Sequence, residues 1–89
     1  MSFQKSLNKR NLLAFAYFKS GRIDEARDEL ISLIDEHSSY MAYRQLIYLE
    51  KSQGNFQDAR LWTDACLEQF PDNKKVKTIL NNLITEGER

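Results

Sequence analysis

The chain has 89 residues, of which 42% are hydrophobic, and this length suits one small domain. Its 13 basic and 13 acidic residues cancel to a formal net charge of zero, which argues against RNA or DNA as the main partner, because nucleic-acid binders usually carry a basic surplus. A single cysteine, a polar N-terminus without a signal peptide, and a longest apolar run of only residues 12–18 favour a soluble cytoplasmic protein that neither spans a membrane nor carries disulfides.

The first two predicted helices form a hairpin. The first helix runs from about Leu7 to Lys19, and Gly21 stands where a left-handed C-terminal cap is needed. Asp24 and Glu25 begin the second helix, because carboxylates stabilise the positive end of the helix dipole. Apolar residues at helical spacing predict the buried stripe of this second helix. Its members are Ile23, Ala26, Leu30, Leu33 and Ile34.

The third predicted helix runs from about Tyr40 to Gln53. Ser38 and Ser39 supply the break before it and its N-cap, since short hydroxyl side chains can accept hydrogen bonds from free backbone N–H groups. Gly54 ends this helix in the way that Gly21 ends the first.

A fourth helix from about Phe56 to Phe70 completes a second hairpin, and a fifth helix closes the chain. The segment 71–73, Pro-Asp-Asn, stops the fourth helix and caps the fifth. Helical spacing predicts the buried residues. They are Ala59, Trp62, Cys66 and Phe70 in the fourth helix, and Val76, Ile79, Leu80, Leu83 and Ile84 in the fifth.

The two hairpins are related by an internal repeat. Residues 21–27 match residues 54–60 at an offset of 33 positions: glycine on glycine, apolar on apolar, acid on acid, and Ala-Arg on Ala-Arg. Repeats of about 20–50 residues are typical of solenoids. Ala26 and Ala59 lie near the start of the second helix of each copy, where a small side chain lets two helices approach closely.

These residues resemble the tetratricopeptide repeat family. The matching positions are Leu13, Ala14, Tyr17, Gly21, Ile23, Ala26 and Leu30 in the first copy, and Tyr43, Leu46, Gly54, Phe56, Ala59, Cys66 and Pro71 in the second. Arg10 and Glu50 replace a large apolar residue and an aromatic residue of the family pattern. The resemblance implies an all-α, right-handed helical-hairpin array of about five antiparallel helices in a single domain, with hairpins at residues 7–38 and 39–71 and a closing helix at 72–86.

The same resemblance implies that the first helix of each hairpin lines a concave binding surface. The core side of the first helix is assigned to Leu13, Ala14 and Tyr17, with Arg10 at its edge. The opposite side is also apolar, and a helix that is apolar nearly all round is expected to be covered on more than one side. The residues assigned to a peptide-binding groove are Asn8, Asn11, Leu12, Phe15, Phe18, Lys19, Met41, Arg44, Gln45, Tyr48 and Lys51.

The functional hypothesis is a protein-binding module or small chaperone whose apolar groove holds an amphipathic helix or apolar peptide of another protein. A chaperone for secretion-system subunits would fit this description. Phe15 and Phe18 could instead be core residues covered by the N-terminal segment through Phe3, or they could pair with a second copy in a homo-oligomer. A single-stranded RNA-binding array like the pentatricopeptide proteins is a further alternative.

No catalytic, metal or cofactor site is expected. His37 lies at the end of the second helix, where its partial positive charge suits the dipole, and Cys66 is interpreted as a small buried hydrophobe. The acidic residues between positions 24 and 36 are interpreted as a solvated helix face. The sequence contains neither a metal-ligand cluster nor a phosphate-binding glycine loop, which argues against an enzyme.

Overall fold

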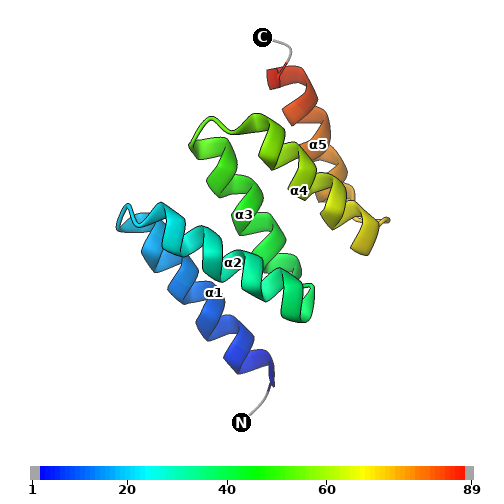
Figure 1. Ribbon diagram of the computed structural model, residues 1–89. Coiled ribbons are helices and arrows are strands. Elements are labelled where there is room, and N and C mark those ends of the chain that lie inside the picture. Colours follow the sequence, from blue (N-terminus) through cyan, green and yellow to red (C-terminus); the bar gives the residue numbers. More distant parts are fainter. Residues whose placement is uncertain (1–2, 88–89) are drawn as a thin grey trace. The chain divides into compact units, whose positions relative to one another are not determined.

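The computed structural model describes the backbone of residues 3–87 and the side chains of residues 8–83 and 85. Within this range all regular structure is helical, which confirms the all-α prediction, and five helices follow one another along the chain (Figure 1). They are α1 (Phe3–Lys19), α2 (Ile23–His37), α3 (Tyr40–Ser52), α4 (Phe56–Gln69) and α5 (Lys74–Gly87). Among the described residues, none of these helices combines the length and the apolar character needed to cross a bilayer.

The chain divides into two compact units, and the division falls within α3, after Leu46. The first unit contains α1, α2 and the first part of α3, and its helices α1 and α2 lie side by side (Figure 1). The second unit contains the rest of α3 with α4 and α5, and α4 and α5 pack together. The prediction of one domain with boundaries at 38/39 and 71/72 stays a prediction.

The predicted glycine caps are present. Gly21 has φ +81° and Gly54 has φ +78°, both in the left-handed region that an L side chain rarely adopts. The N–H of Arg22 donates to the carbonyl of Tyr17 at 2.8 Å, and the N–H of Asn55 donates to Glu50 at the same distance, which closes each helix end. Identical local chemistry therefore ends α1 and α3, as the repeat predicts.

The polar caps also follow the prediction. Ser38 adopts the left-handed conformation (φ 49°) at the end of α2, and the Ser39 hydroxyl accepts a hydrogen bond from the N–H of Ala42 at 3.3 Å. The Asn73 side chain accepts from the N–H of Val76 at 3.1 Å and so caps α5. Local chemistry at Ser38, Ser39 and Asn73 thus separates α2 from α3 and α4 from α5.

Helix α1 begins at Phe3, four residues before the predicted Leu7. Residues 3–6 contain neither glycine nor proline, and Gln and Lys are good helix formers, so nothing in the local sequence stops the helix there. Helices α3 and α4 each end one residue earlier than predicted, at Ser52 and Gln69.

The core of the first unit follows the predicted stripe of α2 but not the predicted face of α1. Ala26, Leu30, Leu33 and Ile34 are buried, and Ile23 is half-buried. On α1, Ala14 is fully buried and Tyr17 half-buried, whereas Leu13 is 45% exposed and its assignment to the core is wrong. Asn11 is buried in its place, because Asn11 lies about 60° from Ala14 around the helix and Leu13 about 100°.

The core of the second unit contains polar residues that apolar periodicity does not find. Ala59, Cys66, Val76 and Leu83 are buried as predicted, while Trp62, Phe70, Ile79 and Leu80 are half-buried; the side chain of Ile84 lies outside the described residues. Thr63 is fully buried, and its hydroxyl donates to the Ala59 carbonyl at 2.7 Å. Glu50 is only 2% exposed, and its carboxyl accepts a hydrogen bond from the Asn55 amide at 3.0 Å. Both side chains satisfy the rule that buried polar groups need hydrogen-bond partners.

The close packing of the first hairpin predicts that Ala26→Leu lowers the free energy of unfolding by about 1–3 kcal/mol, because added methylenes overpack a filled core. Urea unfolding followed by circular dichroism measures the change. Ala16→Leu, at an exposed position of α1, is the matched control and should leave the midpoint nearly unchanged. Equal midpoints for the two variants would contradict close packing at Ala26.

Candidate functional site

The first unit exposes several large apolar side chains. Leu12 is 67% exposed, Phe15 46% and Met41 54%, and these three residues are called the apolar set below. Leu12 and Phe15 are three residues apart and therefore lie on the same side of α1. All three belong to the groove predicted from the sequence, and the structure leaves each of them accessible to a ligand.

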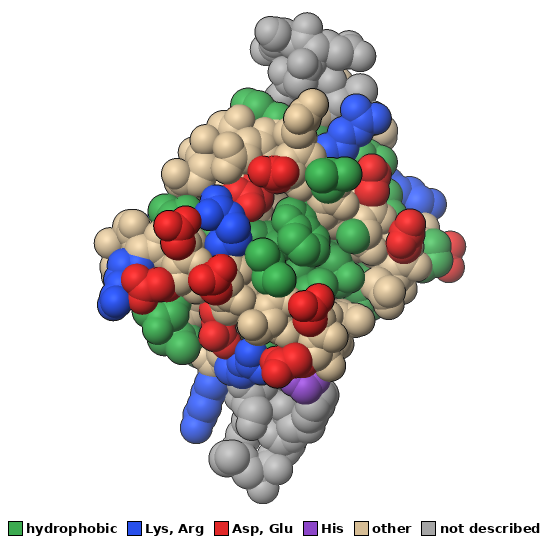
Figure 2. Space-filling view, viewed as in Figure 1, with side chains coloured by type: hydrophobic (Ala, Val, Ile, Leu, Met, Phe, Trp, Pro, Cys, Tyr) green, Lys and Arg blue, Asp and Glu red, His purple; other side chains and the backbone are tan. Residues whose placement is uncertain are grey.

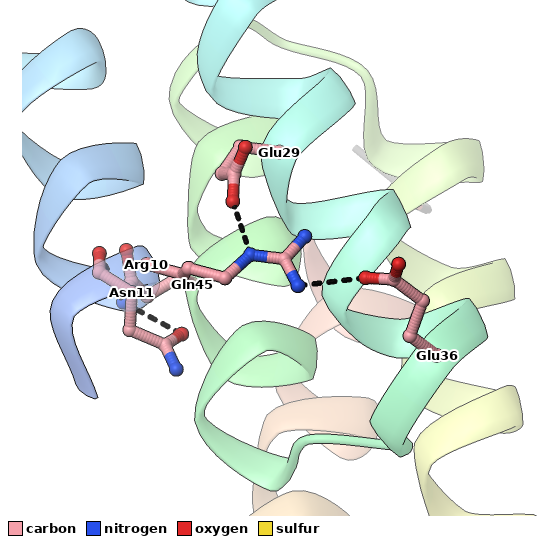
Figure 3. A network of polar contacts seen from close by, with 5 residues as sticks. All are labelled: Arg10, Asn11, Glu29, Glu36 and Gln45. Atoms are coloured by element: carbon pink, nitrogen blue, oxygen red, sulfur yellow. Dashed lines mark hydrogen bonds and ion pairs between the residues drawn. The ribbon is translucent and has the colours of Figure 1, made fainter. Parts of the chain in front are cut away.

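A hydrogen-bonded pair joins α1 to the first part of α3 next to this set. The Gln45 side-chain amide donates to the backbone carbonyl of Asn11 at 3.2 Å, and its distance to the Asn11 side-chain oxygen is 3.3 Å (Figure 3). Phe15 follows Asn11 by one turn of α1, and Met41 precedes Gln45 by one turn of α3. Exposed apolar residues therefore flank this pair on each helix.

The burial of Asn11 corrects its predicted role. Asn11 was assigned to the polar edge of the groove, but only 3% of the residue is exposed. A buried amide that is hydrogen-bonded to the neighbouring helix holds the fold together and is not accessible to a peptide. The prediction that Asn11 contacts the ligand is therefore wrong, and the half-buried Gln45 is engaged with it.

The remaining predicted groove residues differ in exposure. Asn8, Lys19 and Arg44 are exposed, and Phe18 is half-buried. The Lys19 ammonium lies 5.7 Å from the centre of the Phe15 ring, and the Arg44 guanidinium lies 5.8 Å from the Tyr40 ring. Tyr48, which is 64% exposed, and the half-buried Lys51 belong to the second unit.

Other exposed apolar residues were missed by the sequence analysis. Leu13 on α1 was assigned to the core but is 45% exposed. In the second unit Leu61 is 65% exposed and Phe56 38% exposed. No local sequence signal distinguishes these exposed apolar residues from buried ones, since exposure depends on what packs against the helix.

An ion-pair network holds α1 against α2. The Arg10 Nε lies 2.7 Å from Glu29 Oε1, and its Nη1 lies 2.7 Å from Glu36 Oε2 (Figure 3). Arg10 is partly buried, as the sequence predicted for the edge of the core. Glu29 and Glu36 were interpreted as part of a solvated face, which is wrong for Glu29 because it is partly buried in this pair. Their spacing of seven residues, two helical turns on one face, could have revealed the pairing.

The network shifts the acidity of its members. The hydrogen bond from Arg10, followed by the Coulomb attraction of the same group, lowers the pKa of Glu36 from its ordinary value of 4.5. The hydrogen bonds to Glu29 and then Glu36 raise the pKa of Arg10 above its ordinary value. Arg10 therefore keeps its positive charge throughout the pH range in which the carboxyl groups titrate.

The remaining ion pairs of the first unit are exposed. Arg22 pairs with Glu25 at 2.8 Å and Arg27 pairs with Asp24 at 3.0 Å, each at a spacing of three residues. Figure 2 shows acidic and basic side chains interspersed over α2. Such exposed pairs contribute little stability. In these pairs, however, the arginines neutralise acidic charges of α2.

The described residues contain no group of three or more His, Cys, Asp or Glu side chains that could hold a metal ion. Cys66 is buried, as predicted for a small core hydrophobe, and His37 is the exposed last residue of α2. The expectation that the chain is not an enzyme and needs no cofactor stays a prediction.

Comparison with known proteins finds no family model that matches this sequence and no curated protein that is significantly similar to it. The resemblance to tetratricopeptide repeats therefore rests on the sequence pattern of the two copies alone, which includes the internal repeat of residues 21–27 and 54–60.

The burial of Asn11 and its hydrogen bond with Gln45 predict different outcomes for two asparagines on α1. Asn11→Ala removes a buried hydrogen-bonding group and should lower the free energy of unfolding by about 1–2 kcal/mol. Asn8→Ala, at an exposed position of the same helix, should change it by less than about 0.5 kcal/mol. Chemical denaturation measures both changes, and a neutral Asn11→Ala would show that the pair does not stabilise the hairpin.

The lowered pKa of Glu36 predicts a pH-dependent contribution to stability. A carboxyl group whose folded pKa lies below its unfolded value stabilises the fold above the unfolded pKa, and this stabilisation is lost as pH falls through the folded pKa. At pH 7 the native chain should therefore unfold at a higher temperature than Glu36→Gln. The difference should begin to shrink as pH falls below 4.5 and should vanish only below the lower pKa of Glu36 in the folded chain. Glu68→Gln, at an exposed position on α4, is the control. A pH-independent difference would contradict the ion pair.

Proposed function

We propose that the chain is a protein-binding module, a small chaperone or adaptor, that holds an amphipathic helix or apolar peptide of a partner protein against the apolar set. The observation that carries this proposal is the exposure of Leu12, Phe15 and Met41 on either side of the hydrogen-bonded pair of Asn11 and Gln45. Leu12 and Phe15 share one side of α1, and large apolar side chains that share a surface often mark an interaction site, whereas scattered ones need no explanation.

The arrangement suits recognition of a helix. Leu12 and Phe15 lie three residues apart on one side of α1, which is the spacing at which one helix meets the side chains of another. A partner helix with apolar residues at positions i, i+3, i+4 and i+7 would cover them. Burial of one such side chain stabilises a complex by about 1.5–3 kcal/mol, so a few anchors account for a functional affinity.

The internal repeat supports the same function. The resemblance to the tetratricopeptide family assigns Arg44, Tyr48 and Lys51 to the binding residues as well. A chain of that family, a right-handed hairpin array, would cover an aggregation-prone helix, as a chaperone for secretion-system subunits does. The neutral net charge fits a protein ligand better than RNA.

The test is capture of partner proteins by the tagged chain from nuclease-treated native lysate, followed by direct binding of the captured partner's helices as synthetic peptides. Phe15→Glu should weaken peptide binding at least about tenfold, because it places a charge where an apolar side chain would be buried. Its helicity should stay at the native level, since Phe15 is 46% exposed.

Leu61→Glu is the matched control, because Leu61 is 65% exposed but belongs to the second unit. It should bind the peptide like the native chain. Unfolding of Phe15→Glu would instead assign Phe15 to the core and contradict the proposal. Sedimentation of the chain alone provides a further test: a dimer that Phe15→Glu dissociates would show that a second copy covers this surface.

A further inference from the structure

Positive and negative charges of the first unit are separated between its helices. Residues 1–23 contain no Asp or Glu, and neither does the part of α3 that belongs to this unit. The acids of the unit all lie on α2. They are Asp24, Glu25, Asp28, Glu29, Asp35 and Glu36. Of these, Asp24, Glu25, Glu29 and Glu36 form ion pairs with arginines. Although the chain as a whole is neutral, α1 and the first part of α3 therefore carry only basic charges.

Three exposed cations of α1 and α3 remain uncompensated. Arg10 is paired with acids of α2, as are Arg22 and Arg27. Lys9, Lys19 and Arg44 are exposed, and none of them belongs to an ion pair within the described part of the chain. Their charges are therefore available to a ligand.

Two of these cations mark the ends of the apolar set on α1. Lys9 lies three residues before Leu12, and Lys19 lies four residues after Phe15, so each is one helical turn away on the same side. The Lys19 ammonium lies 5.7 Å from the Phe15 ring. Lys9 and Lys19 are ten residues apart, which corresponds to about 15 Å along the helix axis.

We propose that the occupant of this surface is an amphipathic helix whose apolar residues are flanked by acidic residues about ten positions apart, or about 15 Å along that helix. The inference rests on the proposed function and specifies the chemistry of the partner. Leu12 and Phe15 receive the apolar side of the helix, and Lys9 and Lys19 each face a carboxylate. Arg44 provides a further cation from α3.

The charges select the partner more than they strengthen the complex. Complementary charge around an apolar contact increases the association rate and favours the correct partner, and a basic helix with the same apolar residues meets repulsion at both lysines. Because the lysines are exposed, this preference depends on ionic strength.

The test uses two synthetic fluorescent helices of about 18 residues, which are about 27 Å long. Both carry Leu at i, i+3, i+4 and i+7; one has Glu on either side of this stretch, ten positions apart, and the other has Lys at those places. The glutamate helix should bind the native chain about tenfold more tightly at about 0.1 M salt, since two exposed pairs change from attraction to repulsion. The preference should largely disappear at about 1 M salt, where the Debye length is about 3 Å.

A charge-reversed variant tests whether Lys9 and Lys19 cause this preference. Lys9→Glu with Lys19→Glu should invert the preference, so that the lysine helix binds more tightly. Lys74→Glu with Lys77→Glu changes the net charge by the same amount at exposed positions of α5 and should keep the native preference. A spectrum of the variants by circular dichroism checks that each is folded.

The possible outcomes separate the two proposals. Equal binding of both helices, lost in Phe15→Glu, would overturn the acidic-partner inference but leave the proposed function intact. Binding of neither helix would overturn both. Binding of phosphatidylglycerol vesicles that requires Lys9 and Lys19, without binding of either helix, would assign the surface to an anionic membrane. Self-association that is lost on reversal of both lysines would assign it to the acidic α2 of a second copy.

Discussion

The orientation of α1 is set by polar contacts together with the burial of Ala14 and the partial burial of Tyr17 and Phe18. Ala14 is the only described residue of α1 that is both apolar and buried, and it contributes little apolar area. Arg10 reaches two glutamates of α2, and Asn11 binds Gln45 of α3. These contacts fix the rotation of α1 about its own axis, because each requires a particular side of the helix to face its neighbours. The rest of the first unit is built around that rotation.

This rotation determines which side of α1 remains available. With Arg10, Asn11 and Ala14 facing α2 and α3, Leu12 and Phe15 are exposed beside Lys9 and Lys19. Rotation by one residue would bury Leu13 instead and would leave the Arg10 ion pairs unformed. Polar contacts of this kind add little net stability but specify a unique arrangement. The exposed apolar side is thus a consequence of the same contacts that hold the hairpin together.

The second unit uses polar groups in a similar way. Glu50 occupies a position where the repeat pattern expects an aromatic residue, and it is buried with its carboxyl hydrogen-bonded to Asn55. Thr63 satisfies its own hydroxyl through the Ala59 carbonyl. In both units, residues that depart from the apolar pattern therefore form hydrogen bonds or ion pairs that stabilise the packing. The glycine caps at Gly21 and Gly54 end α1 and α3 in the same way.

The five helices, their order and most of their ends could be predicted from local sequence signals, because caps at Gly21, Ser39 and Asn73 and the apolar period of α2 act within one or two turns of the chain. The start of α1 at Phe3 was the exception, since no stop signal marks it. The sequence also assigned Leu12, Phe15 and Met41 to the groove side of their helices, while a core position for Phe15 stayed open until the structure placed it 46% exposed. The burial of Asn11, the exposure of Leu13 and the pairing of Arg10 with α2 were not predicted from the sequence and became known from the packing of the helices. Those outcomes depend on partners 19, 26 and 34 residues away along the chain, and helical periodicity carries no information on which neighbour a given side will meet.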